Sequence, residues 1–101
     1  MNINIIEKDN TVTAVFDGRL DTLAAQQIAD AIEPLMQHAD QTIVLDCEKM
    51  PFISSSGLRL FLKIRKEVSE KGGKLYLSKV CNDVLQVFKM TKLDEVFEMV
   101  D

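Results

Sequence analysis

An apolar run, a polar loop and an amphipathic helix follow one another in the middle of the chain, and a second apolar run comes after them. The first run is Thr42–Asp46, the helix is Gly57–Glu70, and the second run is Lys74–Ser78. Gly72 and Gly73 separate the helix from the second run, and glycine just beyond a helix is its usual terminator. This order predicts two parallel strands joined by a helical crossover.

The N-terminal segment carries the signals of a β-hairpin. Residues 2–7 alternate polar and apolar side chains, and Thr11–Phe16 is rich in β-branched residues. Asp9 and Asn10 between them form a turn signal. We therefore expect an antiparallel strand pair at one edge of the sheet.

A helix is expected between the hairpin and the central strand, from Thr22 to His38, with Asp21 or Thr22 as its cap. Apolar residues recur there at helical spacing, namely Ile28, Ala31, Ile32 and Leu35. Pro34 lies inside this pattern and should kink or end the helix nearby.

The C-terminal part predicts a short helix over Asn82–Lys89 and a last strand over Val96–Val100. The expected fold class is α/β, with a mostly parallel four- to five-stranded sheet, an N-terminal β-hairpin and helices packed on the sheet. The run Thr42–Asp46 is almost unbroken, as expected of a strand covered on both faces. The length of 101 residues predicts a single domain over residues 1–101.

Composition narrows the classes of function. Hydrophobic residues make up 47% of the chain and charged residues 28%, which is typical of a globular protein. The net charge of −4 argues against binding nucleic acid or an anionic membrane surface. No apolar run approaches the length of about 18 residues that a membrane span needs, and no secretion signal is visible. A cytoplasmic location is therefore expected.

The candidate metal ligands and thiols are few. Cys47 and Cys81 occur without a CxxC motif, and with the lone His38 they cannot supply the usual four zinc ligands. Two reduced thiols packed in or near the core are the expected outcome. We expect no metal and no cofactor.

Three consecutive serines, Ser54, Ser55 and Ser56, precede the second helix. Ser54 or Ser55 is expected to cap the helix. A catalytic serine needs a neighbouring base, and nothing places His38 near this loop. The loop also lacks the glycine-rich phosphate-binding patterns. The chain is therefore not expected to be an enzyme, and a helix cap, a modification site or both remain.

On a helical wheel, the core face of the second helix holds Gly57, Leu60, Phe61, Ile64 and Val68. Leu58 and Leu62 fall well outside this arc, on the side of the serines. They form a candidate contact surface, unless other helices or loops cover them.

At these residues the chain resembles a STAS domain of the anti-sigma factor antagonist type. Asp17-Gly18-Arg19-Leu20-Asp21 resembles the family's G-x-L-D turn, and Ser55-Ser56-Gly57-Leu58 resembles its D-S-S-G-L helix start. Val44-Leu45-Asp46 with Phe52-Ile53 resembles the central strand and its loop, and Gly72-Gly73-Lys74-Leu75 resembles the next turn. One departure is Ser54, which stands where the family usually has Asp.

The resemblance implies a small cytoplasmic regulator of bacteria that is not an enzyme. Such proteins bind an anti-sigma factor that is also a serine kinase, and so free a sigma factor. The kinase ends binding by phosphorylating a serine, here Ser55 by position with Ser56 and Ser54 as alternatives, and a serine phosphatase restores it. Together with the wheel, this resemblance gives the expected partner-binding residues: Asp17, Gly18, Asp21, Ser54, Ser55, Ser56, Gly57, Leu58 and Leu62.

Two other functions remain open on the sequence. The first is a STAS interaction module that works without phosphorylation, as a subunit of a lipid-transport complex or a scaffold in stress signalling. The second is a small sensor that binds a nucleotide at a helix N-terminus.

Overall fold

The chain begins with two strands that form a hairpin, β1 (Asn2–Lys8) and β2 (Thr11–Asp17), in a computed structural model that describes residues 1–101. Asp9 and Asn10 both have positive φ, 52° and 64°, the conformation of a type I′ turn. This turn matches the twist of the two strands and pairs them from Asn2 with Asp17 to Lys8 with Thr11. The expected hairpin is confirmed.

The central crossover is also as expected. β3 (Thr42–Lys49) and β4 (Lys74–Ser78) are parallel and are joined by α3 (Ser55–Glu70). The return from α3 to β4 needs glycine twice. Gly72 has φ +78°, and a Cβ on Gly73 would lie only 2.1 Å from the carbonyl oxygen of Ala39.

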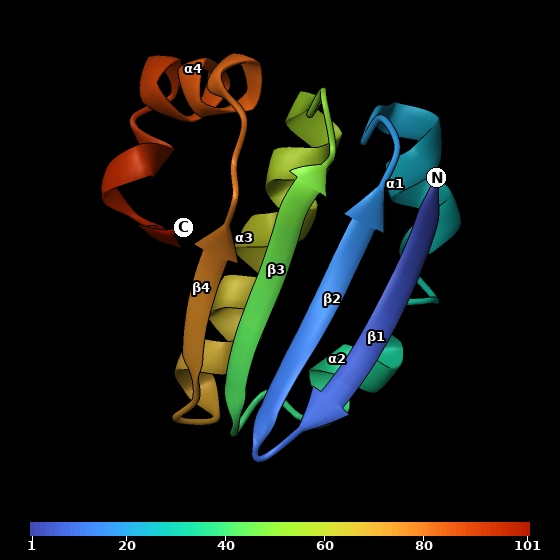
Figure 1. The fold of residues 1–101 in the computed structure, drawn as a ribbon, viewed down its shortest axis with the longest axis vertical. Coiled ribbons are helices and arrows are strands. Elements are labelled where there is room, and N and C mark those ends of the chain that lie inside the picture. Colours follow the sequence, from blue (N-terminus) through green and yellow to red (C-terminus); the bar gives the residue numbers. More distant parts are fainter.

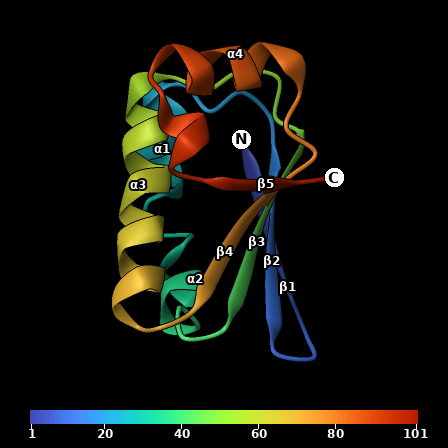
Figure 2. The same ribbon diagram turned by 90° about the vertical axis from the view of Figure 1, so that its left-hand side faces the viewer.

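The five strands lie in chain order across one sheet, β1-β2-β3-β4-β5; Figure 1 shows the first four side by side, and Figure 2 shows β5. β1 is antiparallel to β2, and every other neighbouring pair is parallel. β5 (Glu98–Val100) follows α4 (Asn82–Met90) and a short 3₁₀ helix, η1 (Leu93–Glu95). The mostly parallel sheet with an antiparallel hairpin edge is thus confirmed.

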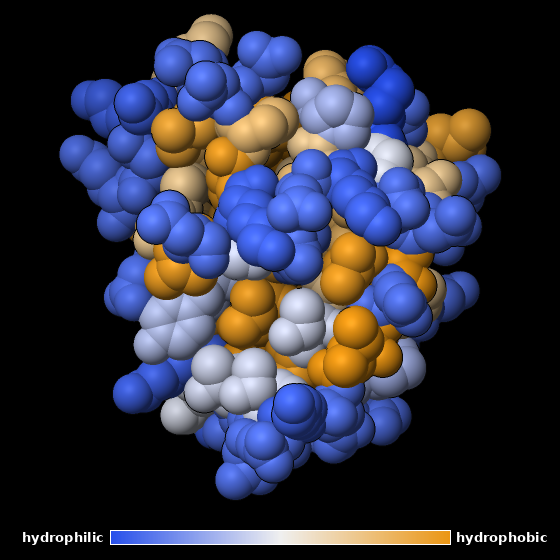
Figure 3. All heavy atoms as spheres, viewed as in Figure 1, coloured by the Kyte–Doolittle hydropathy of each residue, from blue (hydrophilic) through white to orange (hydrophobic).

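The helix layer covers only one face of the sheet. Figure 2 shows α1, α2 and α3 on the same side, while α4 crosses the end at which the parallel strands finish. The expectation that β3 is covered on both faces is wrong. Ile43, Leu45 and Cys47 are fully buried, whereas Val44 and Asp46 between them are only half-buried. Figure 3 views the uncovered face, where apolar and polar side chains are mixed.

The helix expected from Thr22 to His38 is two short helices, α1 (Thr22–Ile28) and α2 (Glu33–Gln37), separated by a turn. Pro34 lies at the start of α2, where its missing N–H costs nothing. A continuous helix would need that N–H in its interior, so the chain breaks before it. The apolar pattern persists across the break because Ile28, Ile32 and Leu35 are buried, although Ala31 is exposed.

Four phenylalanines connect the elements of the core. The ring of Phe61 on α3 lies 5.2 Å from that of Phe16, 6.3 Å from Phe88 and 6.4 Å from Phe97, measured between centroids. These edge-on and tilted contacts join the sheet, α3, α4 and the segment before β5 into one apolar cluster. The longest helix, α3, has 16 residues, and no helix combines the length and hydrophobicity needed to cross a bilayer.

Candidate functional site

Two loops lie side by side where β2 and β3 end. The first leads from β2 into α1, and the second leads from β3 into α3. Leu20 and Ile53 join them as a single parallel bridge. The Leu20 N–H donates to the Phe52 carbonyl, and the Ser54 N–H donates to the Leu20 carbonyl, both at 2.9 Å. The backbone of the serine loop is therefore fixed by a loop from a distant part of the sequence.

Each loop ends in a side chain that caps the following helix. The Ala24 N–H donates to Oδ1 of Asp21 at 2.8 Å, and the Gly57 N–H donates to Oγ of Ser54 at 3.2 Å. Of the two caps that the sequence left open for α3, Ser54 takes the role, and Asp21 rather than Thr22 caps α1. A hydroxyl satisfies the same free N–H that a carboxylate would, so Ser54 serves as a cap in the place of an aspartate.

Ser55, the first residue of α3, is exposed, and its hydroxyl has no hydrogen-bond partner within the chain. Ser56 is half-buried and donates from Oγ to Oγ1 of Thr22 at 3.5 Å, a long contact. Because Ser54 fills the cap, the hydroxyl of Ser55 is free for other chemistry. It lies at the positive end of a sixteen-residue helix, where negative charge is favoured.

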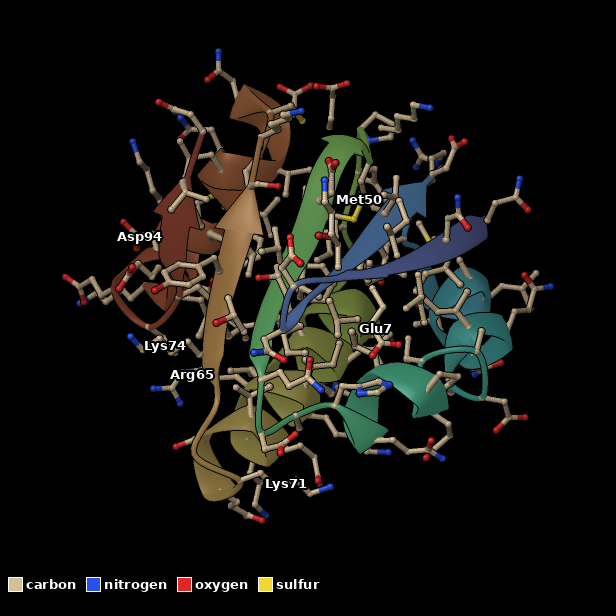
Figure 4. All side chains as sticks on the ribbon, turned by 60° about the horizontal axis from the view of Figure 1, so that its bottom comes forward. Glu7, Met50, Arg65, Lys71, Lys74 and Asp94 are labelled. Carbon is tan, nitrogen blue, oxygen red and sulfur yellow. The ribbon has the colours of Figure 1, made fainter.

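No base lies near these serines. The His38 ring contacts the Gln41 side-chain amide at 3.1 Å and Glu7 at 3.4 Å. Glu7 is at the turn end of the hairpin, close to α2 in Figure 4, and the serines are at the opposite end of the sheet. The arrangement therefore contains no serine–histidine pair of the kind that nucleophilic catalysis requires.

Gly57 is held in a tight contact beneath the serines. A Cβ at this position would lie 2.8 Å from Cγ1 of Ile53 and 2.8 Å from Cγ of Leu20, closer than real side chains approach. The absence of a side chain lets α3 begin directly against the Leu20–Ile53 bridge. Gly57 is buried, so its role is to let α3 start close to the bridge, and it does not contribute exposed surface for a partner.

The expected contact surface of Leu58 and Leu62 is half wrong. Leu58 is only 6% exposed and belongs to the core, and Leu62 is half-buried. The helical wheel assumes that one neighbouring layer buries one side of the helix. In the structure α3 packs on the sheet and also against α1 and α2. A second neighbour widens the buried arc of the helix, and Leu58 lies within it.

Asp17 and Gly18 lie at the base of the first loop. Gly18 has φ +125°, and its N–H donates to the carbonyl of Lys49 at 2.9 Å. Asp17 is exposed and is the sheet partner of Lys49. The two residues therefore shape the exit from β2, while Asp21 and the three serines gather around the helix starts.

Three residues of this region are not among the partner-binding residues named from the sequence: Arg19, Leu23 and Phe52. The guanidinium carbon of Arg19 lies 4.2 Å from the centre of the Phe52 ring, a cation–π contact between the two loops. Leu23, on the first turn of α1, is 62% exposed. A large apolar residue outside the stripe of its helix was a usable signal for Leu23, but nothing local to Arg19 indicates the aromatic partner.

The buried cysteine Cys47 does not add a reactive group. Cys47 is fully buried, and its burial, with lesser effects of Asp46 and Cys81, raises the pKa of its thiol to about 12. A thiol with so high a pKa is almost entirely protonated at neutral pH and is a poor nucleophile. Cys81 is half-buried and donates from Sγ to the carbonyl of Met50 at 3.7 Å.

Ligand sites are not apparent around the serines. No three His, Cys, Asp or Glu side chains are grouped so that they could hold a metal ion. Hollows in the surface lie away from the serines: one of about 410 Å³ lies on the uncovered face beside Ile6, Thr13 and Val15, and one of about 230 Å³ opens between α3, β4 and β5. What the two loops offer is an exposed surface with a free hydroxyl.

Comparison with known proteins identifies the family of this fold. The model of the STAS domain matches residues 2–101. The chain belongs to the STAS domain family. The anti-sigma-B factor antagonist of Staphylococcus aureus is 22% identical to this STAS domain over 99 residues, which cover 98% of the chain and 92% of the relative.

Solved structures agree in fold. An anti-sigma-factor antagonist (STAS) domain protein from Planctomyces limnophilus superposes with a TM-score of 0.86 at 24% identity, covering 96% of this chain and 87% of the other. SpoIIAA of Bacillus in its phosphorylated form gives a TM-score of 0.72 at 24% identity, with 99% and 92% covered. At this level of identity the likeness shows the fold alone.

Proposed function

We propose that this STAS domain is an anti-sigma factor antagonist, a binding protein without catalytic activity of its own. It binds an anti-sigma factor that is also a serine kinase. The proposal is supported by relatives that carry the name anti-sigma factor antagonist and by a structural neighbour determined in a phosphorylated form. The observation that carries it is the exposed, unpartnered hydroxyl of Ser55 at the start of α3, beside a cap already supplied by Ser54.

Phosphorylation of Ser55 is the proposed switch, and a serine phosphatase reverses it. A phosphate adds about −1.5 to −2 charges and three acceptor oxygens. At the N-terminus of α3 the charge stabilises the helix by roughly 0.3–1 kcal/mol, so the fold persists. The phosphate weakens binding of the partner, because at the interface the dianion has to be desolvated or meets carboxylates of the partner. A loss of about 3 kcal/mol weakens binding roughly 100-fold.

The proposed binding surface consists of exposed or half-exposed residues around both loops. It takes in Asp17, Gly18, Asp21, Ser54, Ser55, Ser56 and Leu62, and it adds Arg19, Leu23 and Phe52. Gly57 and Leu58 support this surface from below, since both are buried. Because the Leu20–Ile53 bridge fixes the loops, binding needs no large rearrangement of this domain.

The experiment uses four baits in lysate of the source organism: the wild type, Ser55→Ala, Ser55→Asp and the matched control Ser56→Asp. Captured proteins are identified by mass spectrometry, and the affinity of the purified captured protein is then measured by calorimetry. We expect a kinase-like anti-sigma factor with the wild type, Ser55→Ala and Ser56→Asp, and its loss with Ser55→Asp.

Incubating the purified pair with ATP then tests the modification itself. We expect one phosphate on Ser55 of the wild type and none on Ser55→Ala. Transfer to Ser54 or Ser56 instead would move the switch to that residue. If all baits capture the same protein equally well and no phosphate is transferred, the chain is an interaction module that works without phosphorylation.

A further inference from the structure

The two edges of the sheet are protected very differently. β5, at one edge, has only three residues and carries the exposed charge of Glu98. β1, at the other edge, has seven residues in regular register with β2, and no strand pairs with its outer side. Proline, a bulge or an inward charge usually blocks an edge, and none of these interrupts Asn2–Ile6. β1 is therefore an open template for another strand.

The turn determines which backbone groups of β1 are free. In a two-residue type I′ hairpin, the residues flanking the turn exchange both hydrogen bonds, and the pattern alternates from there. Lys8 and Thr11 flank this turn, so the even-numbered residues of β1 face β2. The N–H and C=O groups of Ile3, Ile5 and Glu7 point to the open edge.

The side chains of β1 leave apolar surface at the same edge. Ile3 and Ile5 lie on the helix side, where they are half-buried and pack against the core. Ile6 lies on the uncovered side of the sheet and is 51% exposed. Asn2 and Asn4 are exposed on that side. The core is thus incomplete where the sheet ends.

We propose that a second copy of this chain pairs with β1 through its own β1, antiparallel about a twofold axis at Asn4. The backbone groups of Ile3 then exchange hydrogen bonds with those of Ile5 in the second copy, and the two five-stranded sheets become one. On the helix side, the pairs of Ile3 with Ile5 close the apolar edge of both cores. On the other side, Asn4 faces Asn4, and Asn2 faces Ile6.

Charge selects this register. A twofold pairing keeps each face of the sheet continuous, so the axis lies at a residue, and the alternative that pairs the most residues lies at Ile5, one residue along. That pairing sets the carboxylate of Glu7 (labelled in Figure 4) opposite half-buried Ile3. It thereby desolvates a charge that lies 3.4 Å from the His38 ring in the single chain. The axis at Asn4 instead sets Glu7 opposite Met1, which precedes β1. Glu7 then lies at the end of the paired segment, closer to solvent than it would be opposite Ile3, and Lys8 lies beyond that segment. The fit of β1 to itself is why the occupant is a second copy rather than an unrelated strand.

The test is sedimentation equilibrium of the purified protein over a range of concentrations. The wild type should rise from the mass of 11.4 kDa toward twice that value. Asn4→Lys and Asn4→Asp each place two like charges face to face on the axis, so each should raise the dissociation constant about five-fold or more. An equimolar mixture of the two variants should recover association, because Lys then faces Asp.

Asn2→Lys and Asn2→Asp are the matched controls, since Asn2 is equally exposed but faces Ile6 in the second copy. Mixing them should change nothing. Circular dichroism melts verify that every variant is folded.

A wild type that stays at 11.4 kDa at all concentrations overturns the proposal. So does a mixture of the Asn4 variants that associates no better than either alone. Neither result bears on Ser55, because the dimer does not depend on phosphorylation.

Discussion

The β2–α1 loop and the β3–α3 loop start a helix in the same way and then diverge. In each, a capping side chain accepts from the N–H three residues later, Asp21 from Ala24 and Ser54 from Gly57. The residue after the first cap, Thr22, is engaged by the Ser56 hydroxyl, whereas the residue after the second cap, Ser55, is free. The two loops thus cap their helices in the same way, but only the second leaves a hydroxyl without a hydrogen-bond partner in the chain.

The largest expected effect concerns the third residue after each cap, which is Ala24 in α1 and Gly57 in α3. Gly57→Ala should cost about 2 kcal/mol, because its Cβ would press against Ile53 and Leu20. For a domain of this size the melting temperature falls by roughly 10 °C. The measurement is a thermal melt by calorimetry.

Ala24→Gly is the reciprocal change and should cost about 1 kcal/mol, mainly through the poorer helix propensity of glycine. If Gly57→Ala is as stable as the wild type, the two loops tolerate the same residue, and the tight contact does not restrict the start of α3.

The caps come next. Asp21→Ala and Ser54→Ala should each cost about 1 kcal/mol in urea unfolding, since each leaves one helix N–H without its partner. Ser54→Asp should keep the cap and change stability by only a few tenths of a kcal/mol. An unchanged midpoint for Ser54→Ala would mean that Ser55 can replace the cap, and its hydroxyl would then not be free.

The cation–π contact between the two loops should contribute less to stability than the helix caps do. Arg19→Ala and Phe52→Leu remove the cation–π pair from either side, and a double-mutant cycle should give a coupling of about 0.5–1 kcal/mol. Arg19→Lys keeps the charge and is the control for general electrostatic effects. Zero coupling would show that the cation–π contact does not help to hold the loops together.

The smallest effect is expected for the hydroxyl contact of Ser56. Ser56→Ala and Thr22→Val should each change the free energy of unfolding by less than about 0.5 kcal/mol, because the 3.5 Å contact is long and exposed. A larger loss for Ser56→Ala than for Ser54→Ala would reverse the order of importance of these serines.

Local chemistry made part of this molecule predictable from the sequence. The hairpin follows from β-branched residues around Asp9 and Asn10, and the end of α3 follows from Gly72 and Gly73. Each signal sits within a few residues of the structure it determines. The cap at Ser54 was predictable only as one of two serines, because the choice depends on where the bridge to Leu20 fixes the backbone.

What the sequence concealed depends on neighbours that are distant in the chain. An apolar Val44 does not reveal whether one or two layers of helices cover the sheet. Leu58 is buried because α3 has neighbouring helices as well as the sheet, which a wheel of one helix does not represent. The apolar spacing did not reveal the break between α1 and α2, because it continues through the turn before Pro34. Arg19 and Phe52 meet only after the two loops have come together.

The bridge between Leu20 and Ile53 ties the serine surface to the folded state of the whole domain. An unfolded chain still carries Ser54, Ser55 and Ser56, but it has no paired loops and no helix start. A partner that recognises this surface therefore binds only folded molecules. On heating, the concentration of protein able to bind such a partner would fall with the folded fraction, without any covalent change.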